Sequence, residues 1–260
     1  MILGIGLSCR PVSGQASGVF VLAVSLKGGA TGIFEAIERL SEHARPARLE
    51  KAARLTFAED RLASLAAGAL ADLVAQRFVE CDADPFEYGA FGKPDFRAGF
   101  GFHISLAHSR EVACCAFSRA PVGIDVEGPI AFSEEISSAF ARRELSRMRA
   151  LADQDARACM AARLWTRKEA LGKYHGCGLC DEVLRADVLD GMAPAVDLPV
   201  WDFPSAASKP PFFSTVRVAG QALSTCGHGR LHRARLGVDD MISCISAAER
   251  PTTIGVDAWV

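Results

Sequence analysis

The sequence has no run of about 20 apolar residues, the length that a helix needs to cross a bilayer. It also has no excess of basic residues, since 29 Lys and Arg stand against 31 Asp and Glu and give a net charge of −2. Nucleic-acid-binding domains are usually clearly basic. The apolar first residues lack the positive charge that precedes the core of a secretory signal. We therefore expect neither a membrane nor a nucleic acid as partner.

The chain also lacks the regular cysteine spacing of a disulfide framework. Its nine cysteines are odd in number, and Cys114 and Cys115 are adjacent within an apolar run that is typical of a buried strand. This usage predicts a reducing, cytoplasmic location. Cys177 and Cys180 have the spacing of half a zinc site, but no second pair with that spacing exists, and the nearby glycines favour a turn after a helix instead.

The order of the expected elements indicates an α+β fold. With 260 residues, the chain fits one large domain or two closely packed halves. From Leu179 onward, prolines exclude long helices and the sequence is strand-like. Hydrophobic spacing predicts strands over 19–26, 102–106, 111–118, 122–126 and 241–247, and helices over 34–43, 45–80, 132–152 and 153–175.

Two acidic residues alternate with apolar ones near the middle of the chain, in Gly123-Ile124-Asp125-Val126-Glu127. Residues two apart in a strand point to the same face, so Asp125 and Glu127 should project side by side. Their repulsion would be relieved by a hard cation such as Mg²⁺, which commonly takes one or two carboxylates together with substrate phosphates. Taken alone, the pattern fits a solvated strand edge equally well.

A second candidate segment lies in the predicted helix 153–175. Trp165, Glu169 and Lys173 are spaced at i, i+4 and i+8 and share one face, with Lys168 next to Glu169. A carboxylate between two lysines could complete a metal site or act as a general base, while the ammonium groups hold phosphate oxygens. The alternative is an ordinary salt bridge between Glu169 and Lys173.

Together, the two segments resemble the 4′-phosphopantetheinyl transferase superfamily. Its strand motif is matched by Val122-Gly123-Ile124-Asp125-Val126-Glu127, and its W-x-x-K-E-(A/S)-x-x-K helix by residues 165–173. Asp125 and Glu169 are 44 positions apart, as the family requires. Residues 176–179 are similar to the glycine-containing turn that follows.

Further matches point to the surfactin-synthetase-activator type. Residues 91–94 are similar to its G-K-P loop, and residues 105–109 to its N-x-S-H-S strand end, although Ser105 replaces the asparagine, Ala107 the serine, and Arg110 a following glycine. The resemblance implies two similar α/β halves packed as a pseudo-dimer within a monomer. The N-terminal half would be 1–120, and the C-terminal half, 121–260, would carry the metal-binding motifs.

The resemblance implies an activity that moves phosphopantetheine from coenzyme A to a serine of an apo-carrier protein. It implies Mg²⁺ held by Asp125, Glu127 and Glu169, with Glu169 also the base that removes the serine proton. Lys173 would assist the reaction and, like Lys168, contact phosphate. Adenosine 3′,5′-bisphosphate would be the leaving group. Carriers of fatty-acid, polyketide and secondary-metabolite pathways all fit.

The same resemblance implies further contacts with coenzyme A. The basic residues concerned, besides the two lysines of the helix, are Arg48, Lys51, Lys93 and His108; Asp125 would reach the pyrophosphate through the metal. Glu144 falls where the family often has a glutamate near the site, but it equally fits a helix surface. Two other functions stay open: a coenzyme A- or carrier-binding module without turnover, and a metal-dependent pyrophosphate hydrolase.

Overall fold

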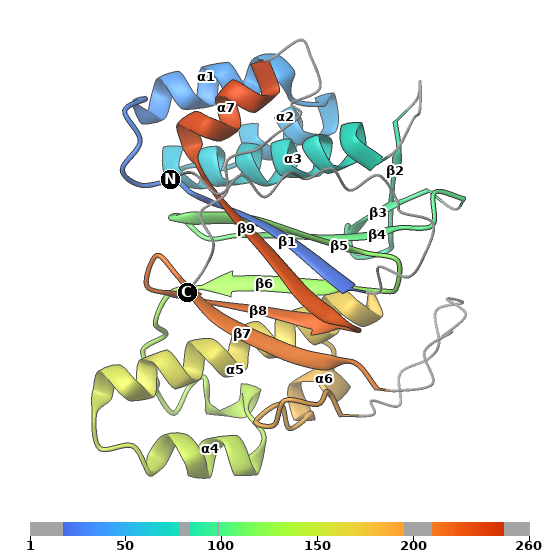
Figure 1. The fold of residues 1–260 in the computed structure, drawn as a ribbon. Coiled ribbons are helices and arrows are strands. Elements are labelled where there is room, and N and C mark those ends of the chain that lie inside the picture. Colours follow the sequence, from blue (N-terminus) through green and yellow to red (C-terminus); the bar gives the residue numbers. More distant parts are fainter. Residues whose placement is uncertain (1–17, 79–83, 98, 195–209, 247–260) are drawn as a thin grey trace, which may run out of the picture.

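The computed structural model describes residues 18–78, 84–97, 99–194 and 210–246. These residues form four layers, with two β-sheets stacked between an upper and a lower layer of helices (Figure 1). The mixed α+β class predicted from the sequence is therefore confirmed. Within the described part of the chain, no helix combines the length and apolar character needed to span a membrane.

The first sheet has the strand order β4-β5-β1-β9. The central β1 (Gly18–Ser25) pairs antiparallel with β5 (Val112–Ser118) and parallel with β9 (Arg230–Gly237), and β4 (His103–His108) pairs with β5. Its outer face is covered by α1 (Ile33–His43), α2 (Pro46–Ala53), α3 (Ala58–Phe78) and α7 (Val238–Ser246) (Figure 1). The hairpin of β2 (Phe86–Tyr88) and β3 (Pro94–Phe96) lies between α3 and β4 in sequence.

The second sheet has the order β6-β8-β7, formed by β6 (Gly123–Glu127), β8 (Gln221–Gly227) and β7 (Phe212–Val218). The long helix α5 (Gln154–His175) packs on it, and α4 (Arg142–Arg149) and α6 (Asp181–Arg185) pack beside α5. A 3₁₀ turn, η1 (Ser137–Ala139), precedes α4.

The two sheets face each other across an apolar layer that decides where the acidic residues of β6 point. Ile124 and Val126 are buried in this layer with Val21 and Cys114 of the first sheet. Because side chains alternate along a strand, the odd-numbered positions of β6 lie on the opposite face, toward α5. The prediction that Ile124 and Val126 enter the core is confirmed.

The C-terminal segment crosses back to the first layer. β9 pairs with β1, and α7 packs with α1 and α3 on the same face of the first sheet. A boundary drawn at residue 120 therefore does not separate the layers, since residues 230–246 lie with the N-terminal elements.

Three predicted elements differ from the structure. The helix expected over 45–80 is two helices, and the acidic residues Glu59 and Asp60 in the first turn of α3 mark its separate start. The helix expected from 132 begins only at Arg142, where Glu144 accepts the N–H of Ala141 at 2.7 Å and caps the first turn.

The strand predicted over 241–247 is wrong, since α7 occupies 238–246 as a helix. Val238, Met241 and Ile242 are its buried residues, at the three- and four-residue steps of a helix that covers the first sheet. α6 likewise interrupts the strand-like region expected after Leu179.

Candidate active site

The site is built where α5 lies directly against β6. A Cβ atom at Gly123 would fall 1.9 Å from the carbonyl oxygen of Ala170 and 2.7 Å from the backbone nitrogen of Tyr174. Only glycine permits this approach, because the conflicting atoms belong to the helix backbone. The contact brings the acidic face of β6 against the turn of α5 that carries Glu169 and Lys173.

Three carboxylates lie near this contact and influence one another electrostatically. Asp125 and Glu127 come from β6, and Glu169 comes from the facing side of α5. Burial raises the pKa of Glu169, and the negative charges of Asp125 and Glu127 raise it further, against the opposite effect of Lys173. Burial and the charge of Asp125 also raise the pKa of Glu127. These mutual effects indicate that the three acidic groups share one electrostatic environment.

Lys173 supplies a positive charge to the same cluster. Its Nζ donates to Oδ1 of Asp125 at 2.7 Å and to the carbonyl of Ile124 at 3.1 Å. Burial opposes its charged form, but Asp125 and Glu169 more than compensate and raise its pKa. The ammonium therefore stays charged at neutral pH beside the carboxylates, where it could also meet a phosphate oxygen.

A second group of basic residues faces Lys173 from the N-terminal elements. Arg48 and Lys51 lie on α2, Lys93 on the loop before β3, and His108 at the end of β4. Desolvation lowers the pKa of Lys51, as do the positive charges of Arg48 and Lys173. This positive charge, which Asp72 and Asp95 offset only in part, would favour a polyanionic ligand at this position.

Arg48 packs against a glycine on the neighbouring helix. A Cβ atom at Gly68 of α3 would lie 2.8 Å from Nε of Arg48, so the glycine leaves the space that the guanidinium stem fills. Burial lowers the pKa of Arg48, partly offset by Tyr88 and Asp72. No local sequence pattern singles out Gly68, because its partner lies on another helix.

His108 is expected to be neutral at physiological pH. Burial, followed by the charges of Lys51, Arg48 and Lys173, lowers its pKa from 6.5 to about 4. We expect the Cε1 proton of His108 to titrate near pH 4 by NMR, and its midpoint to rise when inorganic phosphate binds to the basic group. A midpoint at the ordinary value in the free protein would contradict this environment, and the His108→Gln spectrum would assign the signal.

The same shift has a consequence for stability. The unfolded chain binds the proton at a higher pKa than the folded one, so the contribution of His108 to the free energy of unfolding is present above pH 6.5 and is lost as the pH falls through about 4.

Lys93 lines a pocket of about 210 Å³ between the β2–β3 hairpin and the end of α5. Burial lowers its pKa, opposed by Asp95, whose Oδ2 lies 3.6 Å from Nζ. The same carboxylate oxygen is 3.0 Å from Nδ1 of His103. The sequence motifs did not predict Asp95, although its position two residues after Lys93 is a usable signal.

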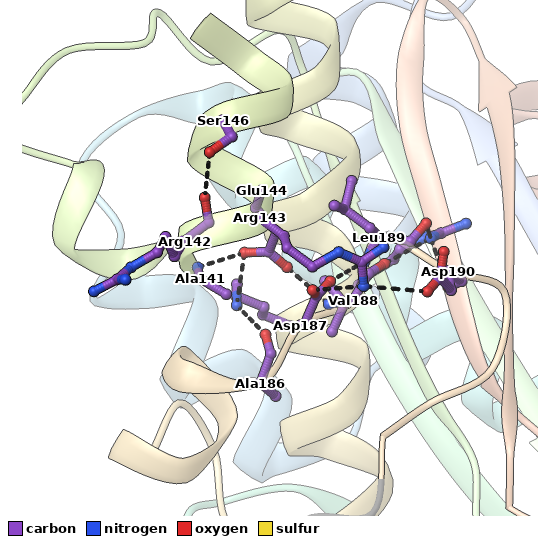
Figure 2. Close-up of polar contacts among 12 residues, drawn as sticks. Ala141, Arg142, Arg143, Glu144, Ser146, Ala186, Asp187, Val188, Leu189 and Asp190 are labelled. Carbon is purple, nitrogen blue, oxygen red and sulfur yellow. Dashed lines mark hydrogen bonds and ion pairs between the residues drawn. The ribbon is translucent and has the colours of Figure 1, made fainter.

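Lys168 is not part of this cluster. Its side chain is fully buried and forms an ion pair with the equally buried Glu144 at 3.0 Å. Figure 2 shows Glu144 among the backbone groups of Ala141 and Val188. The residue that precedes Glu169 therefore points into the scaffold, because consecutive helical positions diverge by about 100°. We correct its expected phosphate contact, and Glu144 is neither a surface residue nor exposed to the site.

The carboxylates suit a magnesium ion in chemistry but do not already form a complete ligand set. Among the described residues, no three His, Cys, Asp or Glu side chains stand close enough to share a metal. The oxygen donors are those that Mg²⁺ prefers, and burial, together with the neighbouring negative charges, raises the pKa of Glu127 and Glu169, which a bound cation would oppose. Asp125, Glu127 and Glu169 are thus the residues that would hold it.

The turn after α5 carries the two cysteines considered for zinc. Gly176 caps α5 in the left-handed conformation with φ 75°, as expected for the residue after a helix end. The Sγ atoms of Cys177 and Cys180 are 3.5 Å apart, and both residues are free, as are the other cysteines within the described ranges. Burial and the contact with Cys180 raise the pKa of the Cys177 thiol to about 12, and within the described residues no further His, Cys, Asp or Glu completes a metal-holding group with this pair.

The comparisons with known proteins agree with this geometry. Residues 121–210, which include β6 and α5, match the family model of the 4′-phosphopantetheinyl transferase superfamily, and the resemblance read from the sequence is thereby confirmed. The chain is also similar to 4′-phosphopantetheinyl transferase Sfp of Bacillus subtilis (strain 168), with 30% identity over 145 residues. That match covers 55% of this chain and 64% of Sfp, so the chain spans less than two thirds of the relative's length.

Proposed function

We propose that the protein transfers 4′-phosphopantetheine from coenzyme A to a serine of an apo-carrier protein and releases adenosine 3′,5′-bisphosphate, with Mg²⁺ as cofactor. The observation that carries the proposal is the contact of Lys173 on α5 with Asp125 on β6, together with the electrostatic influence of Asp125 and Glu127 on Glu169. The family match over 121–210 supports the same reaction.

The two sides of the site have different tasks in this proposal. Arg48, Lys51, Lys93 and His108 would hold the 3′-phosphoadenosine end of coenzyme A, as the positive charges of Arg48 and Lys51 around His108 suggest. The acidic cluster would hold the pyrophosphate through the metal. The bond to be broken is the P–O bond within that pyrophosphate, and it would then lie close to Lys173.

Glu169 would remove the proton of the attacking serine. A serine hydroxyl is a poor nucleophile at neutral pH, so a positioned carboxylate must accept its proton. Lys173, charged beside Asp125, would stabilise the negative charge that develops on the phosphate and leaving oxygens. When bound, Mg²⁺ would act as a Lewis acid and offset the negative charge of the pyrophosphate.

The direct test is to incubate the protein with Mg²⁺, coenzyme A and a panel of apo-carrier proteins and to follow carrier mass. We expect a gain of one phosphopantetheine group on at least one carrier and its loss when EDTA is added. Tight coenzyme A binding without transfer would instead support a binding module. Cleavage of coenzyme A without a carrier would support a pyrophosphate hydrolase.

Lys51 gives a prediction specific to the nucleotide end. Lys51→Ala should raise the KM for coenzyme A by about tenfold, because a charge-assisted hydrogen bond is lost, and should change the KM for dephospho-coenzyme A much less. Steady-state kinetics with both substrates measure this. Arg54→Ala is the matched control. Arg54 directly follows α2, its side chain is exposed, and its ion pair with Glu50 spans 4.0 Å. An equal effect on both substrates would contradict the assignment.

We also propose the finer organisation implied by the resemblance. The protein would act as a monomer of two similar α/β halves, with residues 230–246 lying with the first half in space. A cytoplasmic location is supported by the free cysteines of the described segments. Acyl, peptidyl and polyketide carriers, including those of secondary metabolism, are the candidate partners.

A further inference from the structure

A fully buried ion pair between Lys168 and Glu144 lies beneath the site. Lys168 on α5 and Glu144 on α4 are each 0% exposed at their side chains, and Nζ lies 3.0 Å from Oε2. Charged residues are almost never fully buried unless they are paired. This pair joins two helices immediately beside the residue that the proposed reaction uses as its base.

Both members of the pair have their hydrogen-bonding groups engaged. Oε2 of Glu144 also accepts the N–H of Ala141 at 2.7 Å, and its Oε1 accepts that of Val188 at 2.8 Å (Figure 2). Nζ of Lys168 donates to the carbonyls of Leu184 at 2.8 Å and Ala186 at 2.6 Å. Since an ammonium has three donors, the contacts with Glu144, Leu184 and Ala186 use all of them.

Arg167, the residue before Lys168 on α5, binds the part of the chain that follows α6. Nη1 of Arg167 donates to the carbonyls of Val188 at 2.7 Å and Leu189 at 2.8 Å, and Nε donates to Thr215 of β7. Because consecutive helical residues point about 100° apart, the contacts of Lys168 and those of Arg167 hold α5 from different directions. They fix its position along the axis and its rotation about the axis. That rotation determines where Glu169 and Lys173 point.

We infer that Lys168 and Glu144 are positioning residues for the proposed transfer, acting by holding α5 so that Glu169 and Lys173 face β6. The inference rests on the proposed function. A buried ion pair adds little net stability compared with apolar residues of the same size, but it accepts only a narrow range of geometries. Catalytic groups in turn need support that fixes them to within about 0.5 Å.

The test compares Glu144→Gln, Lys168→Met and the double variant with the wild type. Circular dichroism first establishes that each is folded at the assay temperature. We expect kcat for carrier modification to fall by about tenfold or more in each single variant, because misplaced catalytic groups lose rate steeply, while the KM for coenzyme A stays within about threefold of the wild type. The kcat of the double variant should be no lower than that of the less active single variant, because the pair acts as one unit.

Arg143→Ala is the matched control. Arg143 lies next to Glu144 on α4, but its ion pairs with Asp187 and Asp190 are at the surface, where its side chain is 64% exposed. We expect this variant to keep the wild-type kcat and KM.

The possible outcomes separate this inference from the proposed function. Folded variants with wild-type kcat, while the wild type is active, would overturn the positioning role alone. A higher KM for coenzyme A at unchanged kcat in Lys168→Met would make Lys168 a ligand contact and overturn it too. If Lys168→Met does not fold, the kcat of Glu144→Gln tests the positioning role, because this variant keeps the size of the side chain. Failure of both to fold would assign the pair to stability alone, and an inactive wild type would overturn both proposals.

Discussion

Glu169→Gln is expected to lower kcat for carrier phosphopantetheinylation by about 100-fold or more, while the protein stays folded. The amide keeps the size of the side chain but cannot take the proton of the serine, and it removes one of the three charges that would hold the metal. Coenzyme A should still bind through the basic group of Arg48, Lys51 and Lys93. Calorimetry measures the binding, and carrier mass measures the transfer.

A matched change on the surface separates this effect from loss of acidic charge in general. Glu134→Gln removes a carboxylate that is 76% exposed and pairs with Arg149 outside the site. It should leave transfer unchanged. If Glu169→Gln transferred phosphopantetheine at the wild-type rate, Glu169 would be neither base nor metal ligand.

Gly123→Ala is expected to destabilise the fold by about 3 kcal/mol, at the upper end of the usual cost of overpacking, and to lower transfer with it. The new Cβ would lie 1.9 Å from the carbonyl oxygen of Ala170, which belongs to the backbone of α5 and cannot rotate away. The helix must therefore move from β6 and take the adjacent Glu169 with it. Urea denaturation gives the change in free energy of unfolding.

Gly128→Ala is the control for this prediction. Gly128 follows directly after β6, and a Cβ atom there would meet nothing within 4 Å. Its free energy of unfolding should stay within about 0.5 kcal/mol of the wild type. Equal stability of the two variants would show that the close contact of α5 with β6 is not required.

The strands and the acidic face of the site were predictable from local patterns. β1 and β5 are short apolar runs whose strand character is visible in the local sequence, and alternation in β6 alone separates Ile124 from Asp125. The sequence also indicated α5, because Trp165, Glu169 and Lys173 stand at i, i+4 and i+8 and share one helical face. What these patterns could not supply was the contact at Gly123, which depends on how α5 crosses the sheet.

Lys168 marks the limit of reasoning from spacing. The sequence places it beside Glu169, and a helix with Lys168, Glu169 and Lys173 invites a common ligand. Helical rotation turns Lys168 away, and its partner Glu144 comes from another helix that no local pattern connects to it. α7 shows the same limit, since its short apolar segment fits a strand until the first sheet provides a face for a helix to cover.

The central claim is that Asp125, Glu127 and Glu169 hold one divalent cation with coenzyme A. Paramagnetic resonance of Mn²⁺, added in place of Mg²⁺ together with coenzyme A, tests it most directly. The wild type should bind a single Mn²⁺ tightly, and Asp125→Asn, Glu127→Gln and Glu169→Gln should each weaken that binding. Unchanged Mn²⁺ affinity and spectrum in all three variants would contradict it.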